Sequence, residues 1–152
     1  ISVIKNLNFA VYSESFSCVS SCLDVDDNIW VLFSSQKKLK LFKYNGNGWE
    51  EKSTSGFDDG NEIWETDIAC TSDNRIYIVV KTNDISEGFS SLKFHLFEYS
   101  KRITYKGFFD LAAPPMGQVF RIDIEIDRDD KPVICINNTG PYNNEISIYK
   151  MK

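Results

Sequence analysis

The chain has 152 residues, 42% of them hydrophobic and 14% aromatic, which is enough apolar surface to bury the core of one ordinary domain. Its net charge of −5 argues against binding to nucleic acid or to an anionic membrane surface, because both need a basic patch. Aromatic and β-branched residues dominate the apolar fraction, and they favour pleated strands over helices, so we predict an all-β chain.

The N-terminus begins with a short strand-like segment, residues 1–5. It shows no charged region followed by an apolar region, and no apolar stretch of the chain is long enough to span a bilayer. The chain starts at Ile1 without an initiator Met. This start favours either a mature secreted or extracytoplasmic protein or a segment cut from a longer one.

One pattern then occurs three times: a strand-like run, a tight acidic turn and a second strand-like run. The copies occupy residues 22–31, 69–78 and 125–134. Trp30, Tyr77 and Val133 take the same place in the three copies, so the repeat is roughly 50 residues long. A period of this size is typical of the four-stranded blades of β-propellers.

Each repeat predicts strands that we letter A to D from the propeller axis outward. Strand A is expected at residues 18–23, 66–70 and 122–126, and strand B at 29–33, 76–81 and 133–136. Strand C is expected at 39–44, 94–99 and 146–149, and strand D at 48–52 and 103–108. Asp and Asn tolerate the conformations of tight turns, so the acidic turns joining strands A and B are expected to be structural.

We therefore predict one propeller segment over residues 1–152. Blade 1 covers about 16–52, blade 2 about 63–109, and blade 3 about 119–152 together with the strand at 1–5. Closed propellers use about four to eight blades, so three cannot close alone. A two-fold homodimer would supply six blades, with residues 1–5 of one chain completing the last blade of the other. The remaining blades of a longer chain, or a β-sandwich or barrel, are the alternatives.

The longer connections are expected on one side of the blades, at residues 53–62, 82–91, 110–118 and 137–144. Long loops on a rigid scaffold commonly carry binding sites. Aromatic rings can stack on a sugar while Asp and Asn bind its hydroxyl groups, and the same groups would serve a protein partner. The candidate ligand-binding residues on this side are Phe57, Asp58, Asp59, Trp64, Asn138 and Tyr142.

Near the axis, Asp67 and Asp123 are expected at equivalent positions of strand A, with Ser20 at the matching position of the first blade. Carboxylates around a channel can bind a ligand or a cation, or act as acid and base. They also commonly accept hydrogen bonds from neighbouring backbone amides. Both interpretations stay open for these three residues.

Other motifs predict no catalytic residue, metal or cofactor. His95, the only histidine, lies in a strand C away from the axis, so we expect a structural role. The stretch from Asp24 resembles a calcium loop but has Ile29 where that loop needs Gly. Cys18 and Cys22 would lie roughly 13 Å apart on one strand, too far for a disulfide, and we expect the four cysteines to be reduced, with a disulfide or metal role as the alternative.

The sequence Asp24-Val25-Asp26-Asp27-Asn28-Ile29-Trp30-Val31 resembles the blades of two-component-regulator and NHL-type propellers. That resemblance implies a sensor or scaffold domain that binds ligands or other proteins. We therefore predict a non-catalytic binding module for a carbohydrate or a protein partner. The alternative is a glycan-acting hydrolase or lyase that uses carboxylates at the mouth of the propeller.

Overall fold

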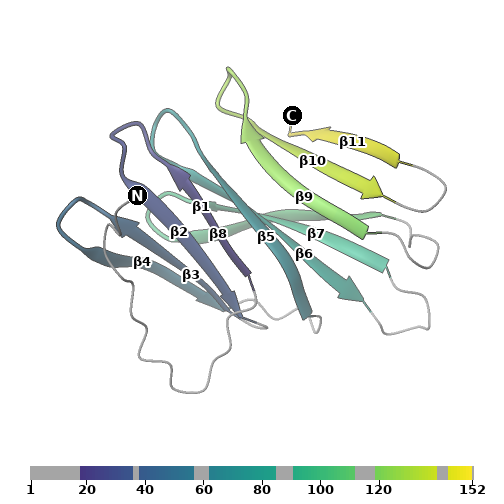
Figure 1. Ribbon diagram of the computed structural model, residues 1–152, viewed down its shortest axis with the longest axis horizontal. Helices are drawn as coiled ribbons and strands as arrows, with labels where there is room; N and C mark the ends of the chain where they lie inside the picture. The colour runs from purple at the N-terminus through teal and green to yellow at the C-terminus, as the bar shows by residue number, and fades with distance from the viewer. Residues whose placement is uncertain are drawn as a thin grey trace.

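The computed structural model describes residues 18–35, 38–56, 62–84, 91–111, 119–139 and 144–151. These residues form eleven strands in three separate antiparallel sheets, which lie next to one another like the blades of a propeller (Figure 1). The predicted all-β, propeller-like fold is confirmed. Within these ranges, no helix has the length and apolar character needed to cross a membrane.

Each sheet follows the order of its strands along the chain. The first consists of β1 (Cys18–Leu23), β2 (Ile29–Ser35), β3 (Lys38–Tyr44) and β4 (Trp49–Gly56). The second consists of β5 (Glu62–Cys70), β6 (Ile76–Asp84), β7 (Ser91–Tyr99) and β8 (Ile103–Leu111). The third consists of β9 (Val119–Ile126), β10 (Pro132–Thr139) and β11 (Asn144–Lys150). Its expected fourth strand, residues 1–5, lies outside the described residues.

Several strands run further than the sequence predicts, so the connections on the long-loop side are shorter. β4 continues to Gly56, and β5 already begins at Glu62. The ends of β6 and β10 contain Thr and Asn, which look like loop residues in the sequence. Backbone pairing continues through them because a ladder needs only N–H and C=O groups, whatever the side chain.

The register of the three sheets is the same. Leu32 of β2 pairs with Leu41 of β3, Val79 of β6 with Leu96 of β7, and Cys135 of β10 with Ile148 of β11. We call the side of a sheet that bears these pairs its forward face, because in the first two sheets it packs on the next sheet. The other side is the backward face.

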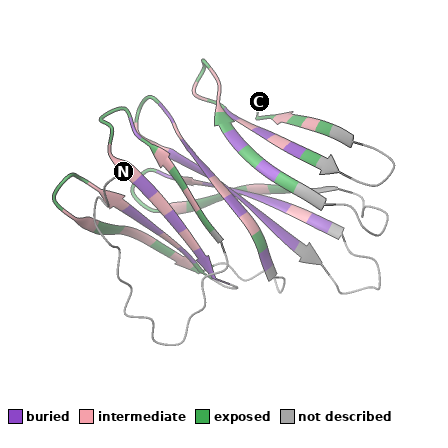
Figure 2. Cartoon of the chain, viewed as in Figure 1, coloured by how far each residue is buried: buried purple, intermediate pink, exposed green. Residues whose placement is uncertain are grey.

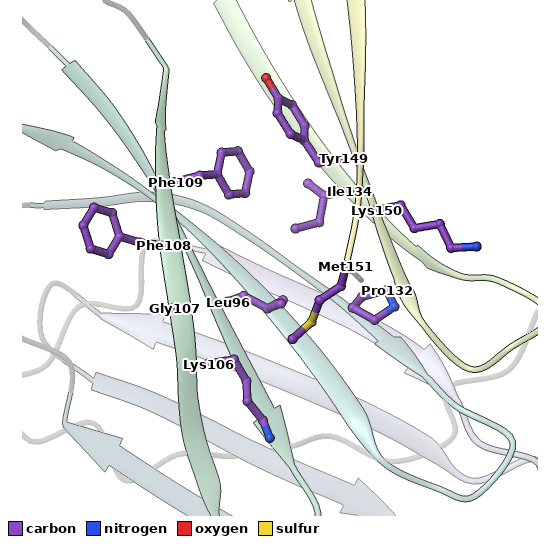
Figure 3. A pocket seen from close by; sticks show the side chains of 10 residues that line it. All are labelled: Leu96, Lys106, Gly107, Phe108, Phe109, Pro132, Ile134, Tyr149, Lys150 and Met151. Carbon is purple, nitrogen blue, oxygen red and sulfur yellow. The ribbon is translucent and has the colours of Figure 1, made fainter.

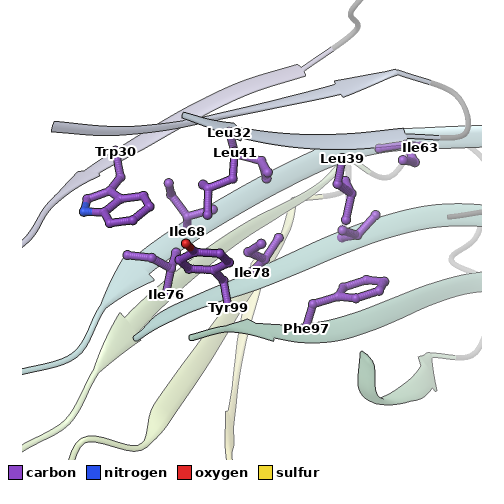
Figure 4. Close-up of a cluster of buried hydrophobic side chains, with 11 residues drawn as sticks. Trp30, Leu32, Leu39, Leu41, Ile63, Ile68, Ile76, Ile78, Phe97 and Tyr99 are labelled. Carbon is purple, nitrogen blue, oxygen red and sulfur yellow. The ribbon is translucent and has the colours of Figure 1, made fainter. Parts of the chain in front are cut away.

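Two hydrophobic cores join the three sheets. Between the first two sheets, Leu32 and Leu41 pack with Ile76 and Ile78 of the backward face of the second (Figure 4). Between the second and third sheets, the second core has the composition that the register predicts: Ala69, Tyr77, Val79, Leu92, Phe94 and Leu96 against Ile122, Ile124, Ile134 and Ile136. Buried and exposed residues alternate along β9, as expected for a strand with one covered face (Figure 2).

The three acidic turns share one conformation. The fourth residue of the connection has a positive φ in each copy, 59° at Asp27, 63° at Asn74 and 56° at Asp130, which Asp and Asn tolerate better than other side chains. In the first and third turns, a carboxylate closes the loop by accepting backbone N–H groups, and in the second the hydroxyl of Thr71 does so. The turns are structural, as predicted.

Among these turn residues, Asp24 has the most hydrogen-bonding partners, and its side chain is fully buried. It accepts hydrogen bonds from the indole of Trp30 at 3.0 Å and from the backbone of Asn28 at 2.9 Å, and it pairs with Lys43 at 2.7 Å. Burial alone would raise the pKa of Asp24, but the hydrogen bonds from Lys43, Trp30 and Asn28 outweigh it and lower that pKa. The first turn is thereby tied to β2 and β3.

We predict that Asp24→Ala lowers the free energy of unfolding by about 3 kcal/mol, because it leaves a buried indole N–H and an ammonium group without their partner. Thr71→Ala, the matched change in the second turn, should cost about 1 kcal/mol, since the bonds of its hydroxyl with Asp73 and with the backbone of Arg75 are lost but no buried charge is left unpaired. Urea unfolding of the two variants measures the difference. Equal losses would contradict this account of the turn.

Candidate functional site

The inner strands of the three sheets, β1, β5 and β9, lie side by side. A groove of about 390 Å³ crosses them and is lined mainly by polar atoms. Its lining consists of residues 21–23, 67–70 and 123–126. Each strand contributes a short stretch, so the groove exists only because the three sheets meet there.

Asp67 and Asp123 both line this groove, from neighbouring strands. They occupy equivalent positions, since Asp67 pairs with Val79 and Asp123 with Cys135. Ser20 holds the same position of the first sheet, opposite Leu32. The predicted equivalence of the three residues is therefore confirmed by the register.

Asp67 also joins the second and third sheets. Its Oδ2 accepts a hydrogen bond of 2.9 Å from the backbone N–H of Ile124 in β9. Burial raises the pKa of Asp67 to about 6, the Ile124 N–H opposes this rise, and the neighbouring Asp123 carboxyl adds to it. The groove therefore holds two carboxyl groups from neighbouring strands, and Asp67 keeps its proton into mildly acidic solution.

Two cysteines lie on the wall of the groove, Cys22 of β1 and Cys70 of β5. Burial raises the pKa of the Cys22 thiol to about 12 and that of the Cys70 thiol to about 11. Both therefore stay protonated at neutral pH, and a protonated thiol is a poor nucleophile and metal ligand. Cys22, Cys70 and Cys135 are free cysteines, and the described ranges contain no cluster of His, Cys, Asp or Glu that could hold a metal.

The other predicted site residues do not line the groove. The Ser20 hydroxyl lies 3.4 Å from that of Thr66 on the adjacent strand β5. Trp64 is 51% exposed at a register shift of β5 between Ile63 and Glu65. Asn138, expected in a loop, pairs through its backbone within the third sheet. Phe57, Asp58, Asp59 and Tyr142 lie outside the described residues.

Ser21 and Glu125 also line the groove beside the aspartates, although neither was predicted as a site residue. A signal was available for Glu125, because Arg121, Asp123 and Glu125 alternate with isoleucines along β9. That alternation marks a strand with one polar side. Ser21 gave no such signal, since it lies among small residues.

His95 lies in the outer part of the second sheet, as expected. It is buried, with Nε2 3.1 Å from the hydroxyl of Thr82 and Nδ1 3.4 Å from that of Tyr105. Its strand, β7, contributes nothing to the lining of the groove. His95 therefore has structural partners and cannot act as a base on a ligand bound at Asp67.

A second hollow, of about 270 Å³, is apolar and lies between β8 and the third sheet (Figure 3). Phe109 and Tyr149 form part of its wall, where their rings stack on each other with centroids 4.6 Å apart. Leu96, Ile134 and Met151 complete its apolar walls. These walls offer shape and hydrophobic surface, whereas the groove at the inner strands offers hydrogen-bonding groups.

No protein-family model matches the chain, and no curated protein matches it. The resemblance to two-component-regulator and NHL-type propellers therefore stays a prediction. Among solved structures, the chain is similar to a fucose lectin from Kordia zhangzhouensis in complex with methyl-fucoside, with 14% sequence identity and a TM-score of 0.46. The alignment covers 88% of this chain and 93% of the lectin chain.

We predict that Asp67 makes folding less favourable as the pH rises from about 4 to above 6. The unfolded chain loses this proton near its ordinary pKa of 3.8, whereas the folded chain holds it to about 6, so ionisation favours the unfolded state within that window. Urea unfolding of the parent and Asp67→Asn across this range should show the parent losing stability relative to the variant. A constant difference would contradict the raised pKa.

Proposed function

We propose that this chain is a non-catalytic binding module whose inner-strand groove takes a carbohydrate. The proposal rests on one observation: Asp67 and Asp123 line the same polar groove, which is formed by three strands. Carboxylate oxygens accept hydrogen bonds from hydroxyl groups, and such charge-assisted bonds are stronger than neutral ones. A ligand rich in hydroxyl groups therefore complements this lining.

The dimensions and charge of the groove limit the range of ligands that it can bind. A volume of about 390 Å³ lies within the range of small-molecule sites, which suits one or two sugar rings better than the flat surface of a protein partner. Asp67, Asp123 and Glu125 make the groove acidic, so it repels phosphorylated or sulfated ligands. We therefore expect a neutral sugar.

A glycan-acting enzyme is the second candidate, because the pKa of about 6 at Asp67 would suit a general acid. The contacts of Asp67 argue against it, because its carboxylate already accepts the backbone N–H of Ile124 at 2.9 Å and holds two sheets together. A general acid needs a carboxyl that is free to approach the leaving group.

We also propose that the chain acts within a closed ring, completed by a second copy or by further blades of a longer chain. Closed propellers use about four to eight blades, and the chain contributes three sheets. In such a ring, the inner strands of the additional blades would continue the wall of the groove. The bound ligand would then contact strands beyond β1, β5 and β9.

Asp67→Asn and Asp123→Asn are each expected to weaken sugar binding about 10- to 100-fold, the cost of losing a hydrogen bond to a charged acceptor. A glycan array first identifies the sugar, and calorimetric titration then measures the affinities. Asp129→Asn is the matched control, because it removes the same charge from an exposed turn and should leave affinity unchanged. If the parent bound no glycan on the array, the carbohydrate-binding proposal would be refuted.

Chromogenic aryl glycosides separate the two candidates. A binding module should release no aryl group above the uncatalysed rate at pH 4 to 7, whereas the enzyme would show release that Asp67→Asn abolishes. The measurement is the absorbance of the freed phenol, with bovine serum albumin at equal concentration as the blank. Turnover by the parent that Asp67→Asn removes would establish the enzyme.

A further inference from the structure

We propose that the forward face of the third sheet binds the backward face of the first sheet of a second copy, so that two chains close one six-bladed ring. The partner is thus this chain itself, joined head to tail at two equal interfaces. The inference rests on the proposed ring and chooses between its two possible completions.

The two interfaces inside the chain show what each kind of face accepts. The forward faces of the first and second sheets present Leu41 and Leu96 at one register position. Each is buried by the backward face of the following sheet, through Ile78 in one case and Ile134 in the other. The same type of contact therefore occurs twice, and a third would extend an interface that already exists.

The third sheet has this forward face without a covering sheet among the described residues. Ile148 takes the position of Leu41 and Leu96 and is 67% exposed, whereas Leu41 is 0% exposed. Ile146 is 68% exposed where its equivalents, Leu39 and Phe94, are fully buried. Two neighbouring isoleucines on the surface of a sheet edge form an apolar patch that in the other sheets belongs to the core.

The first sheet has the complementary exposed surface, because apolar residues of its backward face are uncovered. On its backward face Val19 is 62% exposed, whereas Thr66, its equivalent on the second sheet, is 6% exposed. Leu23 is 60% exposed on the same strand, and Val31 is only partly buried where its equivalent Ile78 is fully buried. Each end of the stack thus presents the face that the other end needs.

The apolar hollow beside β11 indicates a further contact. In the second sheet, Ile103 of the outer strand packs against the core shared with the first sheet. The corresponding place of the third sheet is the hollow lined by Phe109 and Tyr149 in Figure 3. The ladder of β11 continues to Met151, whose N–H donates to Pro132 at 3.3 Å, and its outer edge has no paired strand in the described part of the chain.

We assign this edge to residues 1–5 of the second copy, Ile-Ser-Val-Ile-Lys. Its three apolar residues are all β-branched, a composition that favours a strand. Addition of a strand to an open edge is a common mode of association, because backbone groups supply the hydrogen bonds. The face and the edge would then be covered by the same partner.

A dimer is the simplest way to close the ring of blades. Three sheets lie below the usual range of four to eight blades and six lie within it. A two-fold axis makes the two interfaces identical, so no forward or backward face is left exposed. In such a dimer, the terminal faces of both copies are buried.

The test is the mass of the full chain in solution, measured by light scattering after size-exclusion chromatography. We expect twice the chain mass of 17.5 kDa. Ile146→Asp combined with Ile148→Asp should raise the dissociation constant about 100-fold or more and yield monomer, because two charges would be buried at the interface. Val25→Asp is the control, since Val25 is 59% exposed in the first turn and away from both faces, and it should stay dimeric.

Circular dichroism and thermal unfolding check that the double variant keeps its fold, which is expected because both isoleucines are exposed within one chain. Val3→Pro combined with Ile4→Pro should also weaken the dimer, since proline removes backbone donors from the added strand. A monodisperse parent at the single-chain mass, a mass other than twice the chain, or an unchanged dimer in the folded isoleucine variant would overturn the inference.

Sugar titrations on the same samples separate this inference from the proposed function. A dimer that binds no glycan would refute the carbohydrate proposal and leave the ring standing. A monomer that binds sugar with one site per chain would refute the ring and leave the groove standing. The sugar titration therefore tests the carbohydrate proposal, and the mass in solution tests the ring.

Discussion

The structure depends on one constraint: a sheet with apolar residues on both faces must be covered twice. In the second sheet, Ile78 and Val79 are neighbours in β6, point to opposite sides and are both fully buried. No single sheet can satisfy this alone, so the sheets stack. The twist of each sheet turns the stack around an axis and brings the inner strands together. The position of the groove follows from that arrangement.

The polar groove and the apolar cores are two results of the same alternation. The isoleucines of β9 enter the core shared with the second sheet, while Asp123 and Glu125 alternate with them and line the groove. Asp67 connects both regions, because its carboxylate accepts the backbone N–H of Ile124. The residue that holds two sheets together thus also sets the charge of the surface they form.

Much of the fold could be predicted from the sequence. The three acidic turns could be recognised from their residues alone, because Asp and Asn are the side chains that a turn with a positive φ tolerates. Strand ends could not be predicted as well, since Thr and Asn residues at the ends of β6 and β10 look like loop residues but pair through their backbone. The equivalence of Asp67, Asp123 and Ser20 followed from the period of the repeat and the alternation of the strands.

The site was predicted less completely, for a physical reason. Residues such as Ser21 and Cys22 face the groove only because neighbouring sheets approach their strand, and that approach is set by packing far along the chain. Trp64 shows the reverse, because a register shift that the sequence does not reveal decides its direction. Local patterns specify which residues form strands, whereas contacts between sheets specify which of them share a surface.

The difference between the two ends of the stack gives the molecule a direction. A unit with unlike ends adds to its own kind in one orientation, and the angle between successive units then decides whether growth ends in a circle or continues as a helical filament. In this chain the angle is set by the side chains between sheets. A small change in the volume of a residue such as Leu32 or Val79 would therefore alter the angle between neighbouring sheets as well as the local packing, and with it the closure of the proposed ring.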